Sequence, residues 1–186
     1  MGPGRVQLLV LSGETGGLWS AAVTALGVQG IDQVIELVGN GLLPEHVAER
    51  ELAVVRKELK WRADECSVEG VAHPVGPGNA VVLVIEAEQV TAVFTGFGER
   101  GRPAEEVAKS AVEAAKVWLD ANVPVDEHLA DQLLLPMALA GRGSFRTTKP
   151  SLHTTTNAEI IRRFLPVPIR IEPESELVWR ATVGTG

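Results

Sequence analysis

The chain has 186 residues, 45% of them hydrophobic and 22% charged, so it can bury a core and is not expected to be disordered as a whole. Acidic residues outnumber Lys and Arg by 24 to 17, and the net charge of −7 argues against a broad basic face for polyanions. The single cysteine, Cys66, excludes an intrachain disulfide framework and a cysteine-rich zinc site. Without an apolar run of about 20 residues or a signal-peptide pattern, the chain is expected to be soluble, cytoplasmic and free of membrane segments.

The first predicted elements are short. Residues 6–11 (VQLLVL) form an apolar run between glycines and predict a buried strand. Residues 12–30 are rich in Gly, Ser, Ala and Thr without a clean period, which indicates a loop or an irregular helix. Residues 34–38 predict a second strand, closed by the turn-like sequence Gly-Asn-Gly.

The middle of the chain predicts a compact α/β unit. Apolar residues at helical spacing predict amphipathic helices over 44–61 and 103–119, each beginning near a proline. Strands are predicted at 66–71, 80–86 and 90–95, between the two helices. The apolar stripe of the second helix comprises Val107, Ala111, Ala114, Ala115 and Trp118. Residues 30–121 thus have the order strand, helix, three strands, helix.

The last third predicts a second α/β unit. Asp126 is a suitable N-cap for a helix that reaches residue 139, and its nearly continuous apolar run after Gln132 predicts that it is buried. Short strands are predicted at 144–147 and 151–154, followed by a helix at 157–164 and strands at 167–171 and 177–183. The expected fold class is therefore α/β (α+β).

Among the four histidines, His153 has the most suggestive surroundings. The four lie too far apart for a paired metal motif, and His46 and His73 are expected to be ordinary surface residues. His153 lies in PSLHTTTN, where hydroxyls and helix N-terminal amides can bind an anion, and a neutral imidazole can attack phosphorus. The alternative is a histidine that is hydrogen-bonded within a polar strand–helix junction.

Local charge favours a phosphate-bearing ligand. Residues 141–171 carry a net charge of +5, from Arg142, Arg146, Lys149, Arg162, Arg163 and Arg170 against Glu159. The competing interpretation is a solvated charged face. Asp131 and Gln132 add a carboxylate and an amide that can bind a ribose or a base edge, although a helix cap has the same composition.

Three stretches, GFGERGRPAEEVA (96–108), EHLADQLLLPMALAG (127–141) and PSLHTTTNAEIIRRFLP (150–166), resemble the RNA 3′-terminal phosphate cyclases. LPEHVAERE (43–51) and GPGN (76–79) are also similar to that family, and the resemblance covers residues 30–186. It implies that residues 30–121 are a small inserted βαβββα domain and that 122–186 are the last α/β repeat of a larger catalytic domain. Residues 1–29 would supply a partial strand and loop of that domain, whose N-terminal repeats are absent.

The resemblance also implies an activity. Family enzymes convert an RNA 3′-phosphate end into a 2′,3′-cyclic phosphate with ATP, a ligase-type reaction in RNA processing that passes through a histidyl-AMP intermediate. His153 matches the nucleophile, and the nucleotide contacts match His128, Leu129, Ala130, Asp131 and Gln132. A divalent metal, Mg²⁺ or Mn²⁺, would neutralise the triphosphate, with ligands that remain unknown.

The chain departs from the family in two ways. His128 stands where the family commonly has a tyrosine that stacks on adenine, and this chain has no tyrosine at all. Family enzymes are nearly twice as long, so a surface that their other repeats cover is expected to allow self-association. The alternative function is a truncated, non-catalytic RNA-processing or scaffold module.

Overall fold

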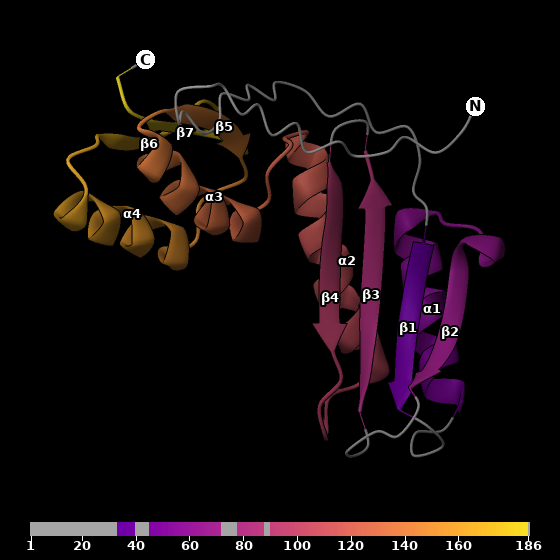
Figure 1. Ribbon diagram of the computed structural model, residues 1–186. Coiled ribbons are helices and arrows are strands. Elements are labelled where there is room, and N and C mark those ends of the chain that lie inside the picture. The colour runs from indigo at the N-terminus through magenta and orange to yellow at the C-terminus, as the bar shows by residue number, and fades with distance from the viewer. Residues whose placement is uncertain (1–32, 40–44, 72–77, 88–89, 186) are drawn as a thin grey trace, which may run out of the picture. The chain divides into compact units, whose positions relative to one another are not determined.

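The computed structural model describes residues 33–39, 45–71, 78–87 and 90–185 (Figure 1). Contacts divide the chain into two compact units, with one boundary between Lys116 and Val117. We call the described residues from 33 to 116 the central unit and residues 117–185 the C-terminal unit. The strand predicted at 6–11 and the loop predicted at 12–30 lie outside the described residues.

The central unit has the predicted order of elements. β1 (Gln33–Gly39) and α1 (Glu45–Leu59) are followed by a 3₁₀ turn, Ala63–Glu65, and by β2 (Cys66–Val71), β3 (Asn79–Glu86) and β4 (Thr91–Phe97). α2 (Ala104–Ala121) completes the βαβββα pattern and continues across the boundary of the unit. The strand order is β2-β1-β3-β4, in which β1 and β2 are parallel and the other pairs antiparallel. The predicted order of strands and helices in this part of the chain is confirmed.

The core of the central unit lies between the sheet and two helices on one side of it (Figure 1). Val81, Leu83 and Ile85 alternate along β3 with half-buried residues and are fully buried. On α2, Val107 and most of the predicted apolar stripe are buried, but Ala114 is exposed. Gly96 permits close packing, because a Cβ there would lie 2.2 Å from the Val107 carbonyl oxygen.

Polar contacts fix α1 against its neighbours. Arg50 pairs with Glu105 of α2 at 2.6 Å, and Glu58 pairs with Lys116 at 2.6 Å. The first pair is exposed and the second is only partly buried, so each contributes little to stability. Glu51 is fully buried, and both of its carboxylate oxygens accept from the Asn79 amide, at 2.6 and 2.7 Å.

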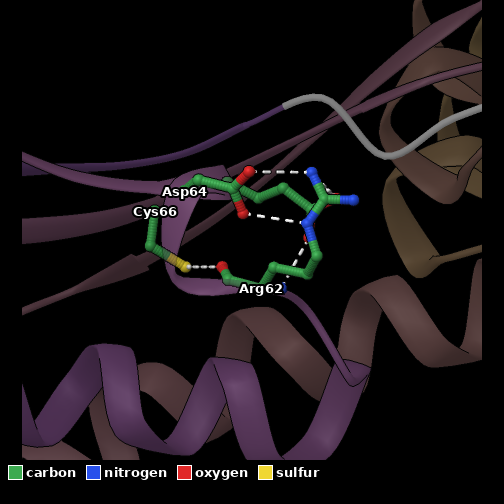
Figure 2. Close-up of polar contacts among 4 residues, drawn as sticks. Arg62, Asp64 and Cys66 are labelled. Atoms are coloured by element: carbon green, nitrogen blue, oxygen red, sulfur yellow. Dashed lines mark hydrogen bonds and ion pairs between the residues drawn. The ribbon is translucent and has the colours of Figure 1, made fainter.

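The turn between α1 and β2 holds the single cysteine (Figure 2). The Arg62 guanidinium donates to both carboxylate oxygens of Asp64 at 2.9 Å, which lowers the pKa of that carboxyl. The Arg62 amide donates to Glu65, and the Cys66 thiol donates to the Arg62 carbonyl oxygen at 3.4 Å. Partial burial raises the pKa of the Cys66 thiol, so this cysteine is held mainly as a neutral thiol near pH 7.

The C-terminal unit packs two helices on a three-stranded sheet. Its elements are α3 (Glu127–Ala140), β5 (Gly143–Thr147), α4 (Leu152–Phe164), β6 (Ile169–Pro173) and β7 (Trp179–Val183). The strand order is β5-β7-β6, all antiparallel, and Val125 forms an isolated parallel bridge with Thr147. Leu134, Phe145, Ile161, Ile169 and Ala181 meet in one buried cluster.

Two predictions in this unit are wrong. Residues 151–154 are not a strand but the N-cap and first turn of α4, which begins five residues before the helix predicted at 157–164. The threonines have high β-propensity, but Ser151 accepts the Thr154 amide and starts a helix instead. α3 is only partly buried, because Leu135 and Leu139 are 48% and 67% exposed. Pro136 lies inside this helix and is also exposed.

Candidate active site

His153 lies in the first turn of α4, two residues after the N-cap, and its side chain is exposed. A helix N-terminus carries a partial positive charge and favours a nearby anion. Most of the surrounding hydroxyls are engaged inside the protein. The Thr154 hydroxyl donates to the Glu127 carbonyl oxygen at 3.3 Å, and the Thr155 hydroxyl donates to the Ser151 carbonyl oxygen at 3.2 Å. The His153 imidazole is therefore the exposed polar side chain of this first turn.

The predicted nucleotide-binding residues occupy the first turns of α3. The helix starts at Asp126, whose carboxylate accepts the Leu129 amide at 2.7 Å, as predicted for an N-cap. His128 is 78% exposed, and Gln132 is exposed one turn later on the same face. Leu129 and Asp131 are partly buried, whereas Ala130 is fully buried. A ligand at this face therefore has more access to the side chains of His128 and Gln132 than to those of Leu129, Ala130 and Asp131.

Two side chains of α4 attach it to this part of α3. The Asn157 amide nitrogen donates to the Asp131 carboxylate at 2.8 Å and to the Asp131 carbonyl oxygen at 3.1 Å. The bond from Thr154 to Glu127 is the second connection. The structure thus brings the turn that carries His153 together with the turn that contains His128–Gln132.

The sequence did not reveal these connections, because residues 151–154 were predicted to be a strand. A helix that starts at Ser151 places Asn157 one turn after His153, on the same side of the helix. The sequence does contain a signal for a helix that starts at Ser151. Ser151 follows Pro150 and can act as an N-cap, and Thr154 stands three residues after it.

The basic residues of 141–171 divide into two groups. Glu174 accepts from both Arg146 and Arg180, and these guanidinium groups lower the pKa of its carboxyl. Arg162 donates to the Ile169 carbonyl oxygen at 2.6 and 3.1 Å. The second group comprises Arg142, Lys149, Arg163 and Arg170, which are exposed, and Arg162 is exposed as well. Lys149 immediately precedes the start of α4 and is the member nearest to His153 along the chain.

No cluster of three or more His, Cys, Asp or Glu side chains suitable for a metal ion occurs among the described residues. His46 is exposed on α1, as expected, and His73 lies outside the described part of the chain. In the same described ranges, no helix is long and apolar enough to cross a membrane.

Comparison with known proteins agrees with this architecture. Residues 34–120 match the model of the RNA 3′-terminal phosphate cyclase (RTC) insert domain. The chain is 50% identical over 127 residues to the RNA 3′-terminal phosphate cyclase of Pseudomonas aeruginosa (strain UCBPP-PA14), covering 68% of this chain and 37% of the relative. With the enzyme of the same name from Ectopseudomonas mendocina (strain ymp), identity is 46% over 144 residues, covering 77% and 42%.

A third relative, from Ralstonia nicotianae, is 47% identical over 146 residues. The family resemblance is therefore confirmed, and this chain is a relative of the RNA 3′-terminal phosphate cyclases. It spans about two fifths of the length of the curated relatives that it matches.

Proposed function

We propose that this chain supplies the nucleophile of an RNA 3′-terminal phosphate cyclase, with His153 as the residue that carries AMP. The observation that supports it most is the bond from Asn157 to Asp131, which joins the helix bearing His153 to the helix bearing the predicted nucleotide contacts. The relatives named RNA 3′-terminal phosphate cyclase support the choice of reaction.

The proposed reaction begins when an imidazole nitrogen of neutral His153 attacks the α-phosphorus of ATP. An N–P bond forms, the bond from the α-phosphorus to the bridging oxygen breaks, and pyrophosphate leaves. The RNA 3′-phosphate oxygen then attacks the AMP phosphorus and releases the histidine. Finally, the neighbouring 2′-hydroxyl attacks the 3′-phosphorus, loses its proton and expels AMP, leaving the 2′,3′-cyclic phosphate.

The first turns of α3 are proposed to bind the nucleotide. The exposed His128 ring is proposed to stack on adenine, and Asp131 and Gln132 are proposed to offer acceptors and a donor for the ribose or base. Leu129 and Ala130 would contribute backbone and apolar contact. Mg²⁺ or Mn²⁺ is proposed to neutralise the triphosphate.

We propose the same division into domains as the resemblance implies. Residues 30–121 form an inserted domain, and residues 1–29 and 122–186 belong to a larger catalytic domain. Two observations support it: residues 34–120 match the insert-domain model, and contacts place a boundary between two units at Lys116 and Val117. The single cysteine favours a reducing compartment, and we propose the cytoplasm.

Self-association is proposed through exposed apolar side chains of α3 and α4. Leu152 and Phe164 are 84% and 80% exposed, and Leu135, Leu139 and Ile160 are also exposed. Large apolar side chains grouped on neighbouring helices are typical of a contact surface. Light scattering after size exclusion tests this: the double variant Leu152→Ser, Phe164→Ser is expected to be monomeric, whereas a monomeric wild type contradicts it.

The decisive experiment for the enzyme is incubation with ATP labelled at the α-phosphorus, together with Mg²⁺ or Mn²⁺. We expect an acid-labile label on the protein that is absent from His153→Ala and present in His46→Ala, an exposed histidine of the central unit. A label that persists in His153→Ala contradicts the proposal. An unlabelled wild type that still binds RNA 3′-phosphate ends would instead favour a non-catalytic RNA-processing or scaffold module.

A further inference from the structure

We propose that Asn157 is a positioning residue that aims the Asp131 carboxylate at the bound nucleotide. The inference rests on the proposed function, because it takes the first turns of α3 as the nucleotide site. It concerns a residue that the resemblance does not assign and that contacts no reacting atom. Its role is to act through Asp131.

The argument starts from the geometry of the amide. One nitrogen, Asn157 Nδ2, donates to Asp131 Oδ1 at 2.8 Å and to the Asp131 carbonyl oxygen at 3.1 Å. A primary amide has two N–H groups, so both bonds can form at once. Together they fix the Asp131 side chain relative to its own backbone, and the carboxylate loses rotamer freedom before any ligand arrives.

The second carboxylate oxygen is then available in a fixed direction. Asp131 is only partly buried, and it lies one helical turn from the exposed His128 on α3. A carboxylate held in one orientation loses less conformational entropy when it accepts from a ribose hydroxyl or a base amine. Asn157 therefore raises nucleotide affinity without contacting the nucleotide.

The Asn157–Asp131 bond also holds the helix that carries His153 against the proposed nucleotide site. Asn157 follows His153 by one turn of α4, so fixing Asn157 against Asp131 also fixes the nucleophile's turn against α3. A merely structural bond between the helices would do this equally well. Thr154 offers the comparison, because its hydroxyl also bonds α3 but at the Glu127 main-chain carbonyl oxygen and not at the Asp131 side chain.

The test measures binding of a labelled ATP analogue with a methylene group between the α- and β-phosphorus, in the presence of Mg²⁺. This analogue cannot transfer AMP, so the measurement is independent of His153 chemistry. Asn157→Ala is expected to raise the dissociation constant about tenfold or more, the usual effect of losing a hydrogen bond to a charged group. Thr154→Val, which removes the other helix–helix bond and keeps the side-chain shape, is expected to change it less than about twofold.

Asp131→Asn separates affinity from folding. Its amide oxygen can still accept from Asn157, so the melting temperature should stay near that of the wild type while analogue affinity falls as in Asn157→Ala. Equal affinity losses in Asn157→Ala and Thr154→Val would show a purely structural role and overturn the inference. Unchanged analogue affinity in Asn157→Ala would also overturn the inference, as would a wild-type protein that does not bind the analogue. If the analogue binds as expected but His153 takes no label from ATP, only the proposed reaction fails.

Discussion

The buried carboxylate of Glu51 on α1 accepts the side-chain amide of Asn79 at the start of β3 through both of its oxygens. Asn79 in turn accepts the Gly98 amide at its carbonyl oxygen, at 2.8 Å. One polar contact therefore connects α1 with the ends of two adjacent strands. A fully buried charged group with a single hydrogen-bonding partner among the described residues depends strongly on that partner.

Glu51→Ala should destabilise the protein by about 2–3 kcal/mol, because the Asn79 amide loses its acceptor and a cavity forms. Glu51→Gln keeps an acceptor oxygen and should cost less. Urea unfolding monitored by tryptophan fluorescence measures both. Glu49→Ala, at an exposed position of the same helix, is the control and should be close to neutral. A control as unstable as Glu51→Ala would contradict this account.

Gly96→Ala should loosen the packing of α2 on β4. The added Cβ would lie 2.2 Å from the Val107 carbonyl oxygen and 2.9 Å from the Ser110 hydroxyl, so backbone must move. We expect a loss of about 1–3 kcal/mol. The matched control is Gly78→Ala, whose Cβ meets nothing within 4 Å. If thermal melts gave the two variants the same midpoint, the close approach of Gly96 to the Val107 carbonyl oxygen would be refuted.

The Glu174 carboxylate should make stability depend on pH. Arg180 and Arg146 lower its pKa in the folded chain, so the folded state binds its proton less readily than the unfolded state. Its contribution is therefore present at neutral pH and is lost as the pH falls below about 4. Glu174→Gln should melt below the wild type at pH 7, and the difference should disappear in acid. Since these groups are exposed, 1 M salt should also reduce the difference. A difference that grows on acidification would have the wrong sign.

His128→Tyr should strengthen binding of the ATP analogue by roughly threefold to tenfold, because a phenol ring stacks on adenine with more area than an imidazole. The position is 78% exposed, so the larger ring needs no repacking. His46→Tyr is the control for a non-specific effect of an added aromatic ring. Unchanged affinity in His128→Tyr would show that this side chain does not stack on the base.

Much of the fold was predictable because local patterns agree with tertiary packing. The alternation in β3 and the helical spacing in α2 both specify a buried face, and the structure confirms those elements. The errors fall where one local preference opposed another. Around Ser151 the capping hydroxyl overrode the strand preference of three threonines, and along α3 an apolar run concealed the exposed Leu139.

The candidate site was less predictable than the fold. His153 and the 128–132 stretch can be selected from the sequence, but their proximity depends on bonds between residues more than 20 positions apart. Nor does the sequence show that Arg162 donates to a backbone carbonyl oxygen and that Arg146 donates to the Glu174 carboxylate. Counting charges in 141–171 treats all six basic residues as equivalent, whereas the tertiary structure engages Arg146 and Arg162 within the protein.

Pro136 has a consequence for the chemistry of α3. It lacks an N–H group, so it cannot donate to the Gln132 carbonyl oxygen four residues earlier, as another residue in that helix position would. Both residues are exposed. The Gln132 carbonyl oxygen therefore accepts no hydrogen bond from the residue at position 136 of the helix. Gln132 is the last residue of the proposed nucleotide-binding stretch. Water or an amino group can bond there without breaking any helical hydrogen bond.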